Sequence, residues 1–137
     1  IPTTDAAAIA SRRAFYELRA ASSPDTRLWQ SDGSTAWTVV YEADPAFQQS
    51  CLNRFVYVKP VKDLNEALHA AETVRGKIST VAFAAPENRA QEIGIILARW
   101  GATRICPIGQ MQQPSLLWRH DGRPGLSELV TWIDCER

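Results

Sequence analysis

The residues with the clearest capacity for chemistry lie close together near the C-terminal end of this chain. His120 and Asp121 are adjacent in a segment bordered by glycine and proline. A carboxylate beside an imidazole can orient the ring for proton transfer or for hydrogen bonding to a substrate. A structural role explains the same pair: Asp121 caps a turn, Gly122 takes a positive φ, and His120 bonds the backbone. The sequence leaves both interpretations open.

Two arginines and two tryptophans surround this pair in the sequence. Because a guanidinium matches the geometry of a phosphate, Arg104 and Arg119 are candidates to bind a phosphate group of a ligand. Arg104 could equally pair with a carboxylate at the edge of the core. Trp118 and Trp132 offer large apolar faces that could line a tunnel for an apolar ligand, although core packing explains them as well.

The cysteines and histidines give weaker signals. Cys51, Cys106 and Cys135 are odd in number and far apart, which indicates reduced thiols instead of a disulfide framework. We expect all three to be buried or incidental, with Cys106 the choice if one is reactive. His69 lies in a predicted helix as a packing or surface residue. Two distant histidines without a cysteine pair predict no metal site.

Length and charge limit the functions to be considered. The chain has 137 residues and 15.2 kDa, which predicts a single domain over residues 1–137. Equal numbers of basic and acidic residues, 15 each, argue against nucleic acid or a membrane surface as partner. The sequence has no apolar run of bilayer length and no signal peptide, so we expect a cytoplasmic protein. Because the chain begins with Ile1, we expect it to be processed or part of a longer protein.

The stretch at residues 55–85 predicts the central element of the fold. It is interpreted as a strand, a helix and a second strand, with Asp63 as N-cap, Glu66 completing a capping box and Gly76 ending the helix. The second strand, residues 78–83, is almost wholly apolar, as expected of a strand covered on both faces. The two strands should pair in parallel with the helix packed across them.

The remaining elements are predicted from periodicity and turn residues. We expect a helix at 6–21 after the capping run Thr3-Thr4-Asp5 and a hairpin closed by Asp32-Gly33 before a strand at 36–41. The further predicted elements are a helix from Pro86 that Gly101 ends, a strand at 104–108, an irregular segment at 110–124 and a last helix at 126–135. The apolar stripe of the first helix should consist of Ile9, Ala10, Ala14, Phe15 and Leu18. This alternation predicts an α/β fold, a largely parallel sheet with flanking helices.

Three blocks of sequence resemble a known family. SCLNRFVYVKPVKDLNEALHAAE, at 50–72, and the strand at 76–83 are similar to segments of aldehyde dehydrogenases. WGATRICPIGQMQQPSLLWRHDGRPGLSELVTWIDCE, at 100–136, closely resembles the C-terminal end of the LuxC family of acyl-CoA reductases, with its Gly-x-x-Arg-Ile, Gly-x-Met and Trp-x-His-Asp-Gly motifs. The chain departs from the dehydrogenases near Ser50 and Arg54, where their Glu-Ile-Phe-Gly-Pro motif would fall.

The resemblance implies a fold similar to the C-terminal part of an aldehyde dehydrogenase catalytic domain. It also implies a reductase that uses NADPH to convert an acyl thioester, such as acyl-CoA, to an aldehyde through a cysteine-bound acyl group. In that family the nucleophilic cysteine and the cofactor domain lie upstream. We therefore expect no catalytic residue in this chain, which should need no cofactor alone and should partner with the remainder of the reductase.

Two other classes of function remain open. The chain could be a stand-alone, non-catalytic α/β module that binds a small ligand or a partner. It could also be an assembly element, because the dehydrogenase superfamily commonly oligomerises through its catalytic domain, and a homo-oligomer would cover a sheet edge and apolar surface.

Overall fold

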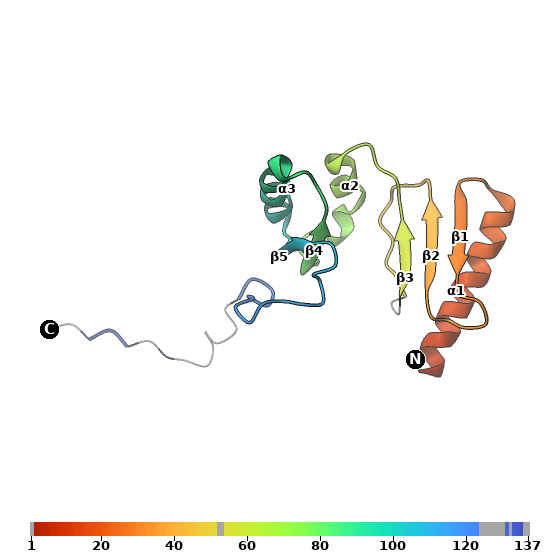
Figure 1. The fold of residues 1–137 in the computed structure, drawn as a ribbon, viewed down its shortest axis with the longest axis horizontal. Coiled ribbons are helices and arrows are strands. Elements are labelled where there is room, and N and C mark those ends of the chain that lie inside the picture. The colour runs from red at the N-terminus through yellow and green to blue at the C-terminus, as the bar shows by residue number, and fades with distance from the viewer. Residues whose placement is uncertain (1, 52–53, 124–130, 132, 136–137) are drawn as a thin grey trace. The chain divides into compact units, whose positions relative to one another are not determined.

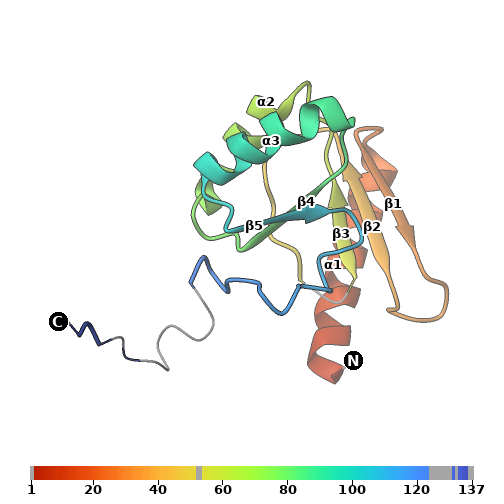
Figure 2. The ribbon, with the colours of Figure 1, turned by 60° about the vertical axis from the view of Figure 1, so that its left-hand side comes forward.

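The computed structural model describes residues 2–51, 54–123, 131 and 133–135. The chain divides into two compact units, Ile1–Thr73 and Val74–Arg137. Figures 1 and 2 show the helices and strands of both units, which are described separately below.

The first unit is built on a three-stranded sheet in the order β1-β2-β3. Its elements are α1 (Thr3–Ser22), β1 (Thr26–Gln30), β2 (Thr38–Glu42), β3 (Phe55–Val58) and α2 (Leu64–Ala70), with a short 3₁₀ helix at Glu72–Val74 after them. β1 and β2 pair antiparallel across the predicted hairpin, and β3 pairs with β2 in parallel. The sheet is therefore mixed, and the prediction of a largely parallel sheet is wrong, because a connection as short as 31–37 can only join antiparallel strands.

Helix α1 covers one face of this sheet with a stripe that the sequence did not predict (Figure 1). Its buried residues are Ile9, Arg13 and Tyr16, whereas Phe15 and Leu18 are 51% and 73% exposed. Ala10 and Ala14 are exposed as well, so the predicted stripe is correct only at Ile9, because a buried arginine occupies the centre of the inward face. Pro2 is the N-cap and no side chain caps the helix, so the predicted capping run lies inside the helix.

Arg13 joins α1 to the connection between β1 and β2. Its Nε donates to Thr38 Oγ1 at 2.8 Å, and Nη1 donates to the carbonyl oxygen of Ser34 at 2.7 Å. Nη2 donates to the Trp37 carbonyl at 2.7 Å and to Ser31 Oγ at 3.2 Å. These four bonds satisfy a buried guanidinium, which would otherwise be strongly unfavourable in the core.

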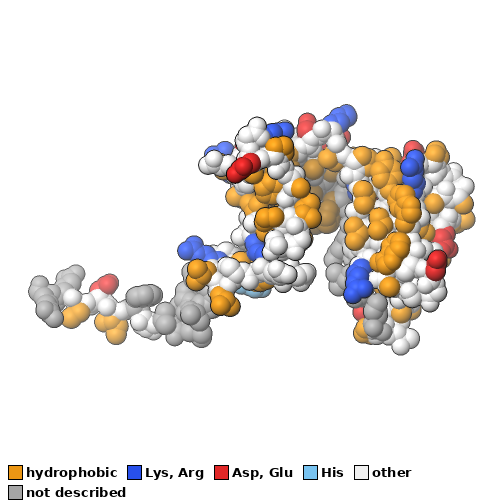
Figure 3. All heavy atoms as spheres, viewed as in Figure 1, with side chains coloured by type: hydrophobic (Ala, Val, Ile, Leu, Met, Phe, Trp, Pro, Cys, Tyr) orange, Lys and Arg blue, Asp and Glu red, His pale blue; other side chains and the backbone are white. Residues whose placement is uncertain are grey.

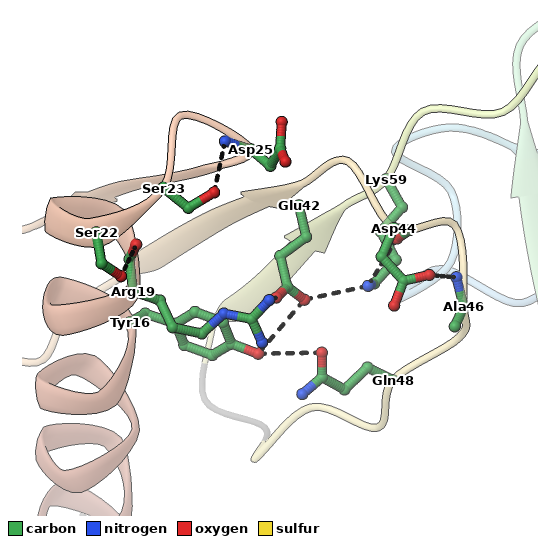
Figure 4. A network of polar contacts seen from close by, with 10 residues as sticks. All are labelled: Tyr16, Arg19, Ser22, Ser23, Asp25, Glu42, Asp44, Ala46, Gln48 and Lys59. Carbon is green, nitrogen blue, oxygen red and sulfur yellow. Dashed lines mark hydrogen bonds and ion pairs between the residues drawn. The ribbon is translucent and has the colours of Figure 1, made fainter.

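A second polar network joins α1 to the ends of β2 and β3 (Figure 4). Its centre is Glu42, a buried carboxylate that pairs with Arg19 Nη2 at 3.2 Å and with Lys59 Nζ at 3.1 Å. The Tyr16 hydroxyl donates to Gln48 Oε1 at 3.0 Å and lies 3.5 Å from Glu42 Oε2. The network therefore holds the 45–50 segment beside the helix.

The predicted capping of α2 is confirmed. The Glu66 amide donates to Asp63 Oδ1 at 2.9 Å, and Glu66 Oε2 accepts from the Lys62 amide at 2.6 Å. The helix ends at Ala70, none of its residues is buried, and Gly76 takes a φ of 70° beyond the 3₁₀ turn.

The second unit contains the parallel pair β4 (Thr80–Phe83) and β5 (Arg104–Pro107), joined by α3 (Glu87–Trp100). The predicted pairing across 55–85 is wrong, since β3 and β4 belong to different sheets. α2 buries too little surface to pack across such a pair, whereas α3 buries Leu97 and Trp100. All four residues of β4 are half-buried, so this strand is not covered on both faces as predicted.

Gly101 ends α3 as predicted, and its backbone adopts a φ of 116°. A Cβ at this position would lie 3.2 Å from both Cα and N of Gly76. The absence of a side chain at Gly101 therefore lets the two backbone segments approach closely.

Replacing Gly101 by alanine should lower the free energy of unfolding by about 2–3 kcal/mol, because it adds left-handed strain to a tight backbone contact. Urea denaturation would measure the change. Gly94→Ala is the matched control: Gly94 lies within α3 with open space around it, so alanine should stabilise the protein by about 0.5–1 kcal/mol. Equal effects of the two substitutions would contradict this account of Gly101.

Most of the last predicted helix lies outside the described residues, because residues 124–130 and Trp132 are not among them. Thr131 and residues 133–135 are not helical, and Ile133 is 86% exposed. Among the helices that the structure describes, none has the length and apolar character needed to span a bilayer.

Candidate functional site

The candidate site lies in the second unit, in the segment that follows β5. Arg104, at the start of that strand, donates from Nη1 to the Met111 carbonyl and from Nη2 to the Gln110 carbonyl, both at 2.8 Å. Turns follow at Gln110 to Gln113 and at Ser115 to Trp118. Arg104 therefore folds the chain back toward its own strand and places Trp118 beside it.

Four of the predicted site residues form one row, which we call the His120 cluster: Arg104, Trp118, His120 and Asp121. The Arg104 guanidinium carbon lies 5.5 Å from the centre of a Trp118 ring, within cation–π distance. The rings of Trp118 and His120 lie 4.8 Å apart at 50°. His120 Nδ1 lies 3.1 Å from Asp121 Oδ2. Arg104 at the start of β5 and the side chains at 118–121 thus form one continuous row of contacts.

The backbone of the cluster makes a tight turn. Asp121 and Gly122 have φ values of 50° and 79°, and the Gly122 amide donates to the Arg119 carbonyl at 3.2 Å. The Arg123 amide donates to the His120 carbonyl at 3.0 Å. The positive φ of Gly122 is as predicted. Both interpretations of the pair are thus partly present, because the same residues form a turn and hold a side-chain contact between imidazole and carboxylate.

This contact determines which ring nitrogen can react. With a proton on Nδ1, which lies 3.1 Å from Asp121 Oδ2, a neutral imidazole keeps its lone pair on Nε2. His120 and Asp121 are 71% and 62% exposed at their side chains, so the ring is open to an incoming molecule. The indole Nε1 of Trp118 is buried and has no hydrogen-bond partner among the described residues. The cluster therefore offers a proton acceptor and an unused donor.

Arg119 does not join the cluster. It is exposed, and it contributes its backbone carbonyl to the turn. Two N–H groups of Arg104 bind backbone carbonyls, and no carboxylate among the described residues pairs with it. The acceptors at Gln110 and Met111 were missed, since a backbone carbonyl carries no signal in the sequence.

A pocket of about 430 Å³ lies at the carboxyl ends of β4 and β5, where ligands of parallel sheets commonly bind. Sequence reasoning missed it, because its residues are ordinary core types. The lining includes Phe83, Ala85, Ala90, Ile105, Cys106 and Ile108. Cys106 is buried, and its thiol makes no hydrogen bond within the described part of the chain. Cys51 is half-buried, and Cys135 is exposed.

Comparison with known protein families identifies the family to which the chain belongs. The family of acyl-CoA reductases (LuxC) matches residues 2–132. The chain belongs to the LuxC acyl-CoA reductase family. The family prediction made from the Trp-x-His-Asp-Gly motif is therefore confirmed. No curated protein matches this LuxC-family chain closely enough to count as a relative. LuxC-family reductases take acyl-CoA as substrate and NAD(P)H as reductant.

The described residues of this LuxC-family chain do not fit a nicotinamide dinucleotide. Phosphates of such cofactors bind to backbone N–H groups of a glycine-rich turn at a helix N-terminus. The turn from β4 into α3 is Ala84-Ala85-Pro86, and Pro86, the N-cap, has no N–H. Arg104, a predicted phosphate ligand, already binds two carbonyls. These residues therefore assign no part of the reaction to a bound nicotinamide cofactor.

Metal binding receives no support from the residues that the structure covers. Among them, no group of three or more His, Cys, Asp or Glu side chains could hold a metal ion.

Proposed function

We propose that this chain is the carboxyl-terminal part of an NADPH-dependent fatty acyl-CoA reductase, which converts an acyl thioester to an aldehyde through a cysteine-bound acyl group. The family match over residues 2–132 supports the reaction class. The resemblance of residues 100–136 to the end of LuxC reductases supports the position in the chain. The nucleophilic cysteine and the NADPH site belong to the remainder of the reductase.

The observation that carries the proposal is the contact between His120 Nδ1 and Asp121 Oδ2 at 3.1 Å. An imidazole oriented by a carboxylate can accept a proton on Nε2 and later return it. We assign this role to His120 in acyl transfer. It takes the proton of the attacking thiol as the new sulfur–carbon bond forms, and it gives that proton to the coenzyme A thiolate as the old sulfur–carbon bond breaks.

The neighbouring groups have supporting roles. The Trp118 indole packs against the His120 ring at 4.8 Å and limits its rotation. Arg104 in turn packs against Trp118 and holds the segment to β5 through two carbonyls. The 430 Å³ pocket at the carboxyl ends of β4 and β5 suits the hydrocarbon part of an acyl substrate, since most of its lining carries no polar side-chain group.

The test compares the 137-residue chain with the full product of its reading frame. Each protein is incubated with NADPH and decanoyl-CoA, and both NADPH consumption and trapped aldehyde are measured. We expect thioester-dependent aldehyde formation by the full product and none by the chain alone. A full product that is folded but consumes no NADPH with any acyl thioester would overturn the proposal and favour a non-catalytic binding module.

A further inference from the structure

Two hollows on the first unit meet at Gln48, and they differ in character. The first, the apolar pocket, has a volume of about 490 Å³ and lies among β3, α2 and the 45–50 segment. The second, the arginine hollow, has about 510 Å³ and lies on the outer side of α1. Gln48 lines both hollows, which makes them neighbours.

The apolar pocket is formed mainly by hydrocarbon surface. Its lining includes Phe47, Phe55, Val56, Val61, Ala67 and Ala71. Figure 3 shows hydrophobic side chains gathered over the strands of this unit. The volume lies in the range of about 300–1,000 Å³ that small-molecule sites occupy. A hydrocarbon chain or ring is the chemistry that this surface would bind.

All the charged side chains that line the two hollows are cationic. Arg12 and Arg19 line the arginine hollow, Lys59 lines the apolar pocket, and neither lining contains an acidic residue. Arg19 and Lys59 share the buried carboxylate of Glu42. Arg12 is half-buried and makes no hydrogen bond or ion pair with any described residue. A half-buried cation without a counter-charge favours an anion beside it.

Two further donors near Arg12 are also unused within the described residues. The Gln48 side chain is fixed by the Tyr16 hydroxyl, which donates to its Oε1 at 3.0 Å, and Figure 4 shows its amide nitrogen turned away from Tyr16. The Tyr57 hydroxyl oxygen is buried and has no hydrogen-bond partner, although Tyr57 lines the apolar pocket.

The electrostatics of Tyr57 show that Arg12 acts at this place. Burial raises the pKa of Tyr57 far above its usual value, and the neighbouring Tyr16 hydroxyl adds to the rise, whereas Arg12 lowers it. The Tyr16 proton is directed to Gln48, so it does not satisfy the Tyr57 oxygen. Tyr57 is therefore neutral at pH 7.

We propose that the two hollows form one binding site for a single-chain amphiphile with an anionic head. The hydrocarbon chain lies in the apolar pocket, and a carboxylate or phosphate lies at Arg12 with the Gln48 amide beside it. This site lies on the first unit and uses no residue of the His120 cluster, so it does not depend on the proposed reductase function.

Isothermal titration of the intact chain with decanoate, decyl phosphate, decanol and acetate, all below micelle concentration, tests the proposal. We expect one saturable site for decanoate and for decyl phosphate, and no binding of acetate. Decanol should bind about ten- to hundredfold more weakly, because a charge-assisted contact is lost.

Two variants test the two halves separately. Arg12→Gln should weaken decanoate about ten- to hundredfold and leave decanol unchanged. Ala67→Leu fills the apolar pocket and should weaken both ligands. Arg99→Gln, at an exposed arginine of α3, is the matched control and should change neither.

Two results of these titrations would overturn the proposal. No saturable binding of decanoate, or equal binding by Arg12→Gln and Arg99→Gln, overturns the proposal. A parallel titration with decanoyl-CoA identifies the source of the ligand: tighter binding of decanoate indicates a free acid, and tighter binding of decanoyl-CoA indicates a thioester whose phosphates supply the anion.

Discussion

Replacing Arg13 by methionine is expected to lower the free energy of unfolding by about 3–5 kcal/mol. Methionine keeps much of the side-chain length and apolar surface but removes all four hydrogen bonds. The Thr38 hydroxyl, on one of the most deeply buried residues of the unit, then loses its donor, whereas the Ser34 and Trp37 carbonyls each keep one donor from Ser31. Leaving buried acceptors without partners costs more than the bonds alone contribute.

Urea denaturation followed by tryptophan fluorescence measures this effect. The matched control is Arg12→Met, one position away on α1, because Arg12 makes no hydrogen bond or ion pair with a described residue. We expect the control to stay within about 1 kcal/mol of the wild type. Similar losses from the two substitutions would show that the bonds of Arg13 do not stabilise the unit as described.

Replacing His120 by glutamine should reduce acyl-CoA-dependent aldehyde formation by the full reductase about 10²- to 10⁴-fold, the contribution typical of a positioned acid–base group. Glutamine can still hydrogen-bond to Asp121 but cannot accept a proton. Because the His120 side chain is 71% exposed, the free energy of unfolding should change by less than about 0.5 kcal/mol. The test compares kcat/KM for acyl-CoA in the two proteins.

His69→Gln provides the control for this experiment, since His69 is exposed on α2 and lies outside the His120 cluster. It should leave kcat/KM unchanged. Asp121→Asn should lower kcat with a smaller change in KM, because the imidazole loses its orienting carboxylate while the surrounding surface is kept. Full activity in His120→Gln would remove His120 from the reaction.

Local features of the fold could be predicted from the sequence because they depend on neighbouring residues. The Asp63 cap, the hairpin around Gly33 and the end of α3 at Gly101 each follow from one or two side chains acting on adjacent backbone. The partner of β3 could not be predicted in this way. Several pairings suit a strand of four residues, and the outcome is set by which helix can bury the resulting face.

Which side chains of α1 are buried could not be predicted from local sequence either. Periodicity favoured Phe15 and Leu18, and it placed Arg13 outside the core because an arginine is rarely buried. Only the four acceptors at residues 31–38 make that burial acceptable, and two of them are backbone carbonyls. The His120 cluster is similar: sequence indicated its residues, but the carbonyls that hold Arg104 could not be recognised beforehand.

The attachment of Arg13 to the hairpin connection bears on the order of folding during synthesis. α1, β1 and β2 end at Glu42, and all four acceptors of Arg13 lie between residues 31 and 38. Contacts of such short sequence separation form quickly, so this part can fold on the ribosome before Phe55–Val58 emerges. Until then the edge of β2 that later receives β3 is open to other chains, and pauses in translation between residues 42 and 55 would prolong that exposure.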